Sequence, residues 1–426
     1  METVLIVIAI LLLALFGSPL FAIIGAIALL AFHSAAIDMS AVIVELNRLA
    51  STPTLIAIPL FTFAGYVLAE SKSPQRIVGI ARALFGWFPG GLAIVSLVSC
   101  AIFTAFTGAS GVTIIALGGL LYPILLKENY PEKFSLGLMT TSGSLGLLFP
   151  PSLPIILYGL VAKISIDKLF VAGFVPGMIL LIVLSIYSVK HGIKSEIPKI
   201  QFTFKNVFEA VKNAAWEIPL PFIIIGGIYG GLFTVTEAAA ITAFYVVVVE
   251  VFIYRDLKLF KDVPKIMQES MVLVGAILII LGTALGLTNY LIDAEVPMKL
   301  FTFIQELITS KILFLILLNI FLLIVGMMMD IFSATIVVVP LIIPIALAYG
   351  VDPVHLGIIF LVNLEIGYVT PPVGLNLFIS SYRFQKPISE VYTSTLPFIL
   401  IRLIILILVT YIPQLSLYLV NLLGIQ

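Results

Sequence analysis

Two short stretches decide the architecture that this sequence predicts: GLLFPP at residues 146–151 and GYVTPP at residues 367–372. The second stretch begins 221 residues after the first, and each ends in a Pro–Pro pair inside a long apolar segment, at residues 134–162 and 356–381. A proline inside a helix removes a backbone donor and clashes with the preceding turn. We therefore expect two membrane-crossing helices, each broken near its middle.

The composition around these stretches is that of a membrane protein. The chain has 426 residues, of which 61% are hydrophobic and 10% are charged, whereas soluble domains carry about 25% charged residues. The 22 basic and 22 acidic side chains leave no basic excess for binding nucleic acid. One cysteine and three histidines exclude a disulfide framework and a multi-ligand Cys/His metal site.

An uncharged run at residues 83–126 predicts a hairpin that enters the membrane and returns on the same side. Its 44 residues would make a straight helix of about 66 Å, whereas the hydrocarbon core is only about 30 Å thick. The stretch FTGASG at residues 106–111 is rich in small residues and is the expected turn. A second hairpin of the same kind is expected at residues 312–346, with Asp330 at its turn.

Together these segments predict an all-α polytopic membrane protein built as an inverted repeat, with nine crossings and two re-entrant hairpins. Basic loops mark the cytoplasmic side, and amphipathic helices at residues 75–87 and 298–309 are expected on the membrane surface. The predicted units are an N-terminal span (3–32) and periplasmic loop within 1–51; a first repeat at 52–189, with a scaffold helix, a surface arm helix, a hairpin (92–126), a broken helix (134–162) and a return helix; basic cytoplasmic loops with two connecting spans at 190–269; and a second repeat at 270–426, with a scaffold helix, a surface arm helix, a hairpin (312–346), a broken helix (356–381) and a final helix (396–423).

Broken helices and hairpin turns at membrane depth are places where secondary transporters bind ions and substrates. Freed carbonyl groups coordinate Na⁺, and freed N–H groups at helix starts attract a carboxylate. Asp330 is the strongest ionisable candidate, for a second cation site, for a substrate hydroxyl, or as a cap on the helix that follows it. Glu365 could coordinate a cation, carry a proton or pair with Arg402.

Uncharged polar side chains gather at the same turns and breaks. Their oxygens could complete a cation shell or meet a polar substrate, although Ser and Thr also form hydrogen bonds within membrane helices. The group comprises Thr107, Ser110, Ser142, Ser144, Asn363, Thr370 and Asn376. Farther along, Glu237 follows two threonines in a typical helix start, capped by Thr234 or Thr236, and a structural role is weighed equally with a functional one.

Four motifs in chain order resemble the large membrane subunit of the tripartite ATP-independent periplasmic (TRAP) transporters. They are FTGASGVT at 106–113, GSLGLLFPPS at 143–152, TEAAA at 236–240 and GYVTPPVGLN at 367–376. The resemblance implies an importer of organic acids in a bacterial inner membrane that is coupled to Na⁺ and works by an elevator movement. Within the family, overall similarity suggests the sialic-acid branch, with C4-dicarboxylates as the alternative.

The resemblance also implies ligand sites and partners. A first sodium site would comprise Thr104, Thr107, Gly108, Ser110, Gly146, Phe149 and Pro151. A second would comprise Met329, Asp330, Ser333, Gly367, Thr370 and Pro372. Substrate would meet Ser144, Ser152, Asp330, Asn363 and Asn376. At least two Na⁺ ions and no organic cofactor are expected. The expected partners are membrane lipid, a periplasmic substrate-binding protein and a small four-helix membrane subunit, the last on a separate chain because this one starts at its first long span.

Three rival functions remain to be weighed. A proton-coupled carrier on the same scaffold would titrate Asp330 or Glu365. An intramembrane hydrolase would need a nucleophile with a base, and no histidine is expected at membrane depth. A passive channel is disfavoured by the two closed hairpins. We therefore expect a carrier rather than an enzyme.

Overall fold

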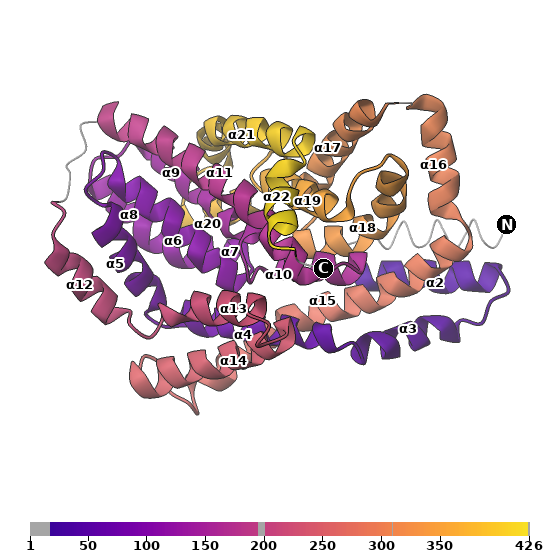
Figure 1. The fold of residues 1–426 in the computed structure, drawn as a ribbon, viewed down its shortest axis with the longest axis horizontal. Helices are drawn as coiled ribbons and strands as arrows, with labels where there is room; N and C mark the ends of the chain where they lie inside the picture. The colour runs from indigo at the N-terminus through magenta and orange to yellow at the C-terminus, as the bar shows by residue number, and fades with distance from the viewer. Residues whose placement is uncertain (1–17, 195–200, 309, 425–426) are drawn as a thin grey trace.

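The computed structural model describes residues 18–194, 201–308 and 310–424, and every regular element within these ranges is a helix (Figure 1). The all-α prediction is therefore confirmed for the described residues. The first half contains α2 (Leu20–Ser34), α3 (Ser40–Ala50), η1 (Pro53–Ile56), α4 (Ala57–Glu70), α5 (Ser73–Phe85), α6 (Gly91–Thr107), α7 (Ser110–Thr113), η2 (Ile114–Gly118), α8 (Gly119–Lys127), α9 (Glu132–Ser142), η3 (Leu145–Leu148), α10 (Leu153–Ala162), α11 (Ile166–Lys194) and α12 (Phe204–Asn213).

The second half repeats much of this succession of long and short helices. It contains α13 (Pro219–Tyr229), α14 (Val235–Val247), η4 (Val248–Ile253), α15 (Asp262–Asp293), α16 (Val296–Leu307), α17 (Lys311–Met328), α18 (Ile331–Ala348), α19 (Pro353–Gly367), α20 (Leu375–Phe384), α21 (Ile388–Tyr411) and α22 (Gln414–Leu422). The helices from α5 to α11 and those from α16 to α21 therefore come in a similar order along the chain.

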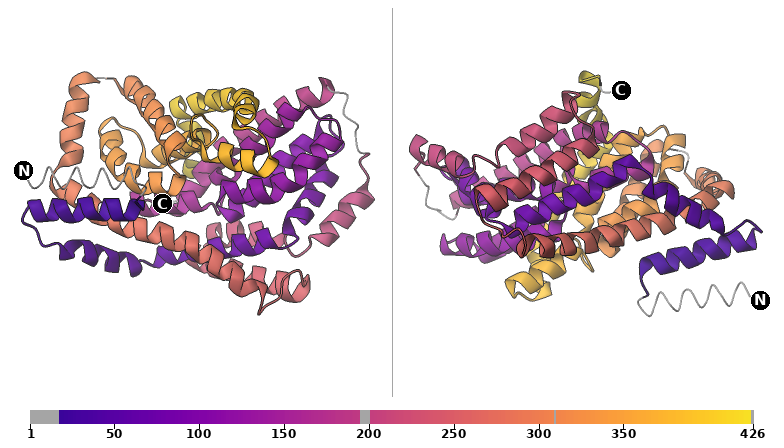
Figure 2. Two further views of the ribbon diagram at one scale, coloured as in Figure 1. Left: turned by 180° about the vertical axis from the view of Figure 1, so that it is seen from behind. Right: turned by 90° about the horizontal axis from the view of Figure 1, so that it is seen from below.

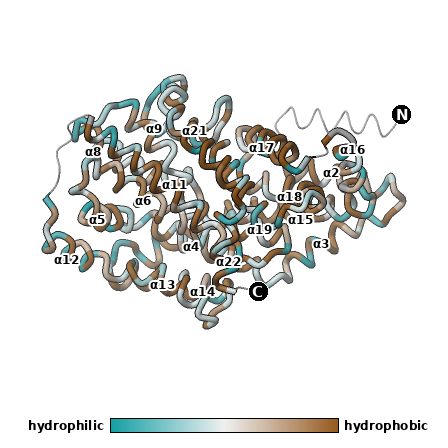
Figure 3. Tube along the Cα trace, turned by 45° about the horizontal axis from the view of Figure 1, so that its top comes forward, coloured by the Kyte–Doolittle hydropathy of each residue, from teal (hydrophilic) through white to brown (hydrophobic). Residues whose placement is uncertain are grey.

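Apolar helices dominate the molecule, as the hydropathy colouring of α17 makes clear (Figure 3). By length and composition, the described residues contain eight helices that could cross a membrane, and a ninth if 132–148 and 153–162 are one span bent by 45°. The eight include the helices on either side of Asp330, which we expected to form a hairpin.

A long helix organises one side of the structure. α15 has 32 residues, and α2, α3 and α4 pack along it (Figure 1). α14 packs on α4, with Ala238 and Ala239 of the TEAAA motif fully buried. The start of α14 is a capping box in which the Thr234 hydroxyl accepts from Glu237 N–H and the Glu237 carboxylate accepts from Thr234 N–H. The predicted cap at Thr234 is confirmed.

The two halves of the chain exchange contacts around their Pro–Pro pairs. α10, which follows the first pair, packs on α18, and α20, which follows the second pair, packs on α7 and η2. In addition, α21 packs on α9 and α22 packs on α11. In both views of Figure 2 the C-terminal helices accordingly lie among helices of the first half. Buried residues of the two halves thus belong to one core.

One predicted helix is wrong. Residues 396–423 were expected to form a single final crossing, but α21 ends at Tyr411 and a separate helix, α22, begins at Gln414. Ile412 has φ −120° and ψ 80°, a conformation outside the helical region of the kind that a following proline favours, here Pro413. The first predicted span, 3–32, lies partly outside the described residues, and its described part is α2.

Candidate functional site

The turn between α6 and α7 depends on a glycine. Gly108 ends α6 with φ +65°, a left-handed conformation that costs other residues free energy. A Cβ atom built on Gly108 would lie only 2.5 Å from the Leu153 Cγ atom. The chain therefore turns tightly here, with α10 pressed against it. We call residues 107–110 the first tip.

The first tip is held against the segment that precedes the first Pro–Pro pair. The Thr104 hydroxyl lies 2.7 Å from the Thr113 hydroxyl and donates to the Gly143 carbonyl at 2.9 Å. Gly146 packs directly on α6, because a Cβ atom there would lie 2.5 Å from Ala105 N. Predicted residues Thr104 and Gly146 are thus neighbours, as a shared site requires.

Each Pro–Pro pair interrupts its helix for several residues. η3 ends at Leu148, Phe149 is extended, and Ser152 N–H donates to the Phe149 carbonyl at 3.0 Å before α10 begins. The second interruption runs from Tyr368 to Gly374, and there the Thr370 hydroxyl donates to the Ile366 carbonyl at 2.7 Å. Both Pro–Pro peptide bonds are cis.

Three of the remaining predicted residues lie at the edges of these interruptions. The half-buried Phe149 ring packs toward α11, with its centroid 6.1 Å from that of Phe174. Pro151 is buried, whereas Pro372 is exposed and its carbonyl accepts from the Tyr392 hydroxyl at 2.6 Å. The surroundings of the two Pro–Pro pairs therefore differ in polarity and exposure.

The turn between α17 and α18 is built around a carboxylate. Met329 ends α17 and Asp330 caps α18, its Oδ1 accepting from Phe332 and Ser333 N–H, both at 3.0 Å. Its Oδ2 accepts from the Ser333 hydroxyl at 2.5 Å. Gly367 lies against this hairpin, because a Cβ atom there would lie 2.5 Å from Gly326 Cα. We call residues 329–333 the second tip; the capping role weighed for Asp330 is observed.

A continuous set of hydrogen bonds joins the two tips. Ile331 N–H, at the second tip, donates to the Tyr368 hydroxyl at 2.5 Å. The Tyr368 carbonyl accepts from Asn376 N–H at 3.0 Å, and the Asn376 side-chain carbonyl accepts from the Ser110 hydroxyl, at the first tip, at 2.7 Å. We call this path the tip-to-tip chain. It connects both hairpins through the segment that contains the second Pro–Pro pair.

Buried polar atoms without a partner surround the first tip. Thr107 Oγ1, Ser152 Oγ and Asn376 Nδ2 are buried, and no hydrogen-bond partner is found for them among the described residues. Burying a polar group without a partner costs about 1–3 kcal/mol. Thr107 is next to Gly108 in the chain, and Ser152 is next to Leu153, whose side chain packs on Gly108. Asn376 contacts Ser110. These atoms are therefore the best candidates for contacting a ligand.

Two of the predicted substrate residues are engaged outside the tip-to-tip chain. Asn363 donates to the Asn319 side chain and to the Ile359 carbonyl, both at 2.8 Å. The Ser144 hydroxyl accepts from Arg402 Nη1 at 2.9 Å. Of the five substrate residues, Ser152 and Asn376 thus lie beside the first tip and Asp330 at the second, whereas Ser144 and Asn363 contact Arg402 and Asn319.

Arg402 is a buried charge between the ends of two broken helices. It is 1% exposed, and its guanidinium donates to the Thr141 carbonyl near the end of α9 and to the Glu365 backbone carbonyl at 3.4 Å. The C-terminal end of a helix carries a partial negative charge, which a nearby cation stabilises. Both carboxylate oxygens of Glu365 are buried and lack a hydrogen-bond partner among the described residues. No salt bridge joins Arg402 to this carboxylate within the described part of the chain.

Sequence reasoning missed Tyr368 as a site residue. It lies inside the quoted GYVTPP stretch and is 3% exposed, so its position was visible, but its contact with the second tip was not. In the described ranges, no cluster of three or more His, Cys, Asp or Glu side chains could hold a metal ion. A monovalent cation would have to be held mainly by carbonyl and hydroxyl oxygens, which both tips provide.

Comparison with solved structures supports this architecture. The fold resembles that in the crystal structure of the Alcanivorax borkumensis YdaH transporter, with a TM-score of 0.59, 12% sequence identity and coverage of 87% of both chains. At this identity the likeness concerns the fold alone.

Sequence comparisons give closer relatives. The chain is 36% identical over 401 residues to the C4-dicarboxylate TRAP transporter large permease protein DctM of Pseudomonas aeruginosa, covering 94% of this chain and 93% of the relative. It is 36% identical over 370 residues to the isethionate TRAP transporter permease protein DctMQ of Oleidesulfovibrio alaskensis, covering 85% and 58%. It is 33% identical over 367 residues to the ectoine/5-hydroxyectoine large permease UehC of Ruegeria pomeroyi, covering 86% of each.

The family model described as the tripartite ATP-independent periplasmic transporter, DctM component, matches residues 4–415. The match spans both Pro–Pro segments, both tips and the TEAAA motif, in agreement with the resemblance seen in the sequence. The chain is a multi-pass membrane protein and belongs to the DctM family of TRAP transporter large permeases.

Proposed function

We propose that this chain is the permease of a Na⁺-coupled importer of a small organic acid in a bacterial inner membrane. The observation that carries the proposal is the tip-to-tip chain. Because Tyr368 and Asn376 join both tips, an ion that orders one tip also favours the arrangement of the other. Coupling of this kind requires that ion and substrate bind the transport states with different affinities.

The ions would bind where the backbone is irregular. At the first tip, Thr107 and Ser110 supply hydroxyl oxygens beside the interruption that ends at Ser152. At the second tip, Asp330 supplies a carboxylate and Thr370 a hydroxyl beside the interruption that follows Gly367. Hard monovalent cations prefer such oxygen ligands, and carriers bind them at broken helices.

We further propose that the two halves form an inverted repeat and that the hairpins move together as an elevator. The matching order of α5–α11 and α16–α21 supports the repeat. The exchanged packing of α10 on α18 and of α20 on α7 and η2 supports a single unit containing both hairpins. The scaffold would include α4 and the two helices that pack on it, α14 and α15.

For the substrate we favour a C4-dicarboxylate, and sialic acid stays a prediction. Relatives at 36% identity are named for C4-dicarboxylates and isethionate, and others at 33% for ectoine. These molecules share a small anionic group, which helix starts and unpartnered donors such as Asn376 Nδ2 bind well. The partners we propose are a periplasmic substrate-binding protein and a small membrane subunit.

Uptake into proteoliposomes tests the proposal. Vesicles would hold this chain with its small subunit, with the loaded binding protein outside, and an inward Na⁺ gradient would be compared with K⁺. Accumulation of a labelled C4-dicarboxylate only with Na⁺ and the binding protein is the expected result. Accumulation of sialic acid instead would revise the substrate alone, and absence of Na⁺-dependent accumulation for every acid tested would overturn the proposal.

A second candidate is proton coupling, which the buried carboxylate of Glu365 favours. The carboxyl group is 1% exposed and lacks a hydrogen-bond partner among the described residues, and buried carboxyl groups at membrane depth mark proton relays in pumps and transporters. In the same vesicles, an inward proton gradient without Na⁺ separates the two candidates. Under proton coupling the gradient alone drives uptake and Glu365→Gln abolishes it; under Na⁺ coupling the gradient alone drives none, and the variant keeps Na⁺-driven uptake.

A further inference from the structure

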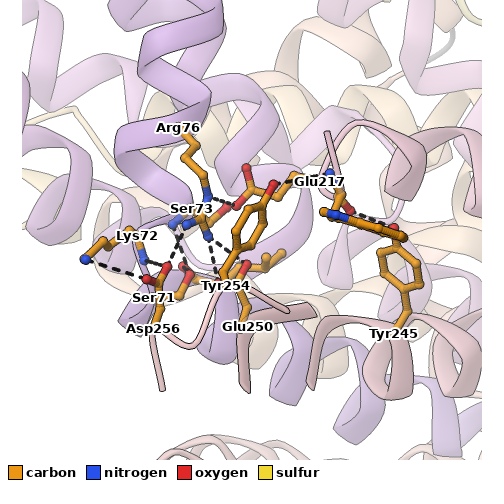
Figure 4. A network of polar contacts seen from close by, with 11 residues as sticks. Ser71, Lys72, Ser73, Arg76, Glu217, Tyr245, Glu250, Tyr254 and Asp256 are labelled. Carbon is orange, nitrogen blue, oxygen red and sulfur yellow. Dashed lines mark hydrogen bonds and ion pairs between the residues drawn. The ribbon is translucent and has the colours of Figure 1, made fainter. Parts of the chain in front are cut away.

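A buried ionic cluster lies where α5 meets the segments around α13 and α14 (Figure 4). Arg76 on α5 contacts three carboxylates: Glu217 before α13 at 2.7 Å, Glu250 in η4 at 2.7 Å and Asp256 in the next loop at 2.6 Å. The Arg76 guanidinium also lies 3.9 Å from the centre of the Tyr254 ring. The three acidic side chains are 6%, 0% and 7% exposed. One guanidinium therefore faces three buried acids.

The charges in this cluster do not balance. Asp256 has a second partner, because the Lys72 amino group lies 3.7 Å away, although the Lys72 side chain is 74% exposed. Glu209 and Lys212 of α12 line an open cavity together with Arg76 and Asp256, and Glu209 is 60% exposed. This leaves Arg76 to neutralise both Glu217 and Glu250, and one buried negative charge remains uncompensated.

The hydrogen bonds identify where the imbalance lies. Both Glu250 oxygens accept from Arg76 Nη2, at 3.0 and 2.7 Å, and Glu217 Oε1 accepts from Arg76 Nε. Glu217 Oε2 is buried and lacks a hydrogen-bond partner among the described residues. Ser73 Oγ is also buried and also lacks a hydrogen-bond partner among the described residues. Ser73 is 1% exposed, and together with Glu217 it lines an otherwise apolar cavity of about 210 Å³. Two unsatisfied oxygens thus face the same place from different elements.

We propose that Glu217 Oε2 binds a proton, which it shares with Ser73 and the Glu250 carboxyl group, and that this proton makes the junction of α5 with α13 and α14 sensitive to pH. A proton here satisfies the orphaned oxygen and removes the uncompensated charge. Two carboxyl groups that share one cation cannot both ionise easily when buried. Burial raises the pKa of Glu217, against the opposing effects of Arg76 and of the nearby Ser73 and Glu250 side chains. The proposal does not depend on the transported substrate.

The direction of the pH effect follows from proton linkage. Because the pKa is raised in the folded protein, the stabilisation is complete below the ordinary pKa of glutamate and is lost as the pH rises through the folded-state pKa. Above that value, Glu217 and Glu250 repel each other and the cluster loosens. α5 should then detach from α13 and α14 more readily in alkaline than in acidic solution.

Infrared spectroscopy of the full chain in nanodiscs tests the proton directly. The spectrum at mildly acidic pH is expected to contain the carbonyl-stretch band of a protonated carboxylic acid, which Glu217→Gln reduces. The matched control is Glu209→Gln on α12, which removes an exposed carboxylate nearby and should leave the band unchanged. An identical protonated-acid band in the wild type and in Glu217→Gln would overturn the proposal.

Hydrogen exchange of α5 tests the consequence. After correction for the intrinsic pH dependence of exchange, protection of residues 73–85 should fall by up to about tenfold per pH unit above the folded-state pKa. Glu217→Gln should flatten this dependence, and Glu209→Gln should follow the wild type. If protection falls equally steeply with pH in the wild type and in Glu217→Gln, the proposed pH sensitivity of the junction is wrong. If Glu217→Gln does not fold, Glu250→Gln provides the same comparison because it neutralises the other acid of the pair.

Discussion

The first tip and the second tip both join two helices by a tight turn, yet they end those helices by different chemistry. The first tip turns at Gly108 with φ +65° and is almost wholly buried, and Thr107 Oγ1 lacks a hydrogen-bond partner among the residues that the structure describes. The second turns at extended Met329, is partly exposed, and uses Asp330 to cap α18. The unsatisfied polar atoms at the first tip are the ones that we propose for contacting a ligand. At the second tip the carboxylate already has three donors, so a ligand meets a group fixed in place.

Adding a methyl group at the first tip should cause the largest loss of stability and of uptake. Gly108→Ala meets both the left-handed strain and the overlap with Leu153, which together cost about 2–5 kcal/mol. We expect a lower melting temperature in detergent and no measurable uptake. Gly231→Ala is the matched control, because Gly231 has φ +67° with no atom within 4 Å of a built Cβ. If both variants lose equal stability, packing at the first tip is not what requires glycine.

The link between the tips is tested by removing the hydroxyl of Tyr368. Tyr368→Phe leaves the buried N–H of Ile331 without its acceptor, which costs about 1–3 kcal/mol. We expect reduced stability together with a weaker dependence of substrate uptake on Na⁺. The control is Tyr349→Phe, which also removes a tyrosine hydrogen bond, to the Ile308 carbonyl, but lies outside the tip-to-tip chain. An unchanged Na⁺ dependence in Tyr368→Phe would mean that the tips act independently.

Asp330 can be divided into its capping role and its charge. Asparagine caps nearly as well as aspartate, whereas alanine costs about 1 kcal/mol. We expect Asp330→Ala to lower the melting temperature and Asp330→Asn to keep it, with both variants losing uptake. Asp352, which caps α19 through Val354 and His355 N–H, provides the control: Asp352→Ala should lose the same stability, and Asp352→Asn should transport normally. Normal uptake by Asp330→Asn would restrict Asp330 to capping.

The smallest effect on stability is expected where the tip-to-tip chain reaches the first tip. Ser110→Ala and Asn376→Ala each remove one member of a buried hydrogen bond, and a double-mutant cycle should give a coupling energy of about 0.5–1.5 kcal/mol in thermal or denaturant unfolding. The same cycle with Thr107→Ala in place of Ser110→Ala should give almost no coupling energy, because Thr107 Oγ1 has no hydrogen-bond partner within the described part of the chain. Equal coupling in both cycles would remove the distinction between bonded and spare polar groups.

Much of the architecture follows from local patterns. A long uncharged run must fold back, a Pro–Pro pair must interrupt a helix, and Thr234 followed by Glu237 begins one. These inferences need only neighbouring residues. Pro413 likewise marks the observed end of α21, but the mostly apolar character of residues 396–423 favours one long helix.

The residues alone therefore determine that this is an all-helical membrane protein with two interrupted segments, and they carry the motifs of its family. Only the tertiary structure decides which polar groups are occupied and which are spare. Asn363 donates a hydrogen bond to Asn319, and Ser144 accepts one from Arg402. The tips are joined through Tyr368. The physical reason is that hydrogen bonds between distant segments depend on how apolar helices pack, and hydrophobic packing is non-directional, whereas each hydrogen bond requires a specific distance and angle.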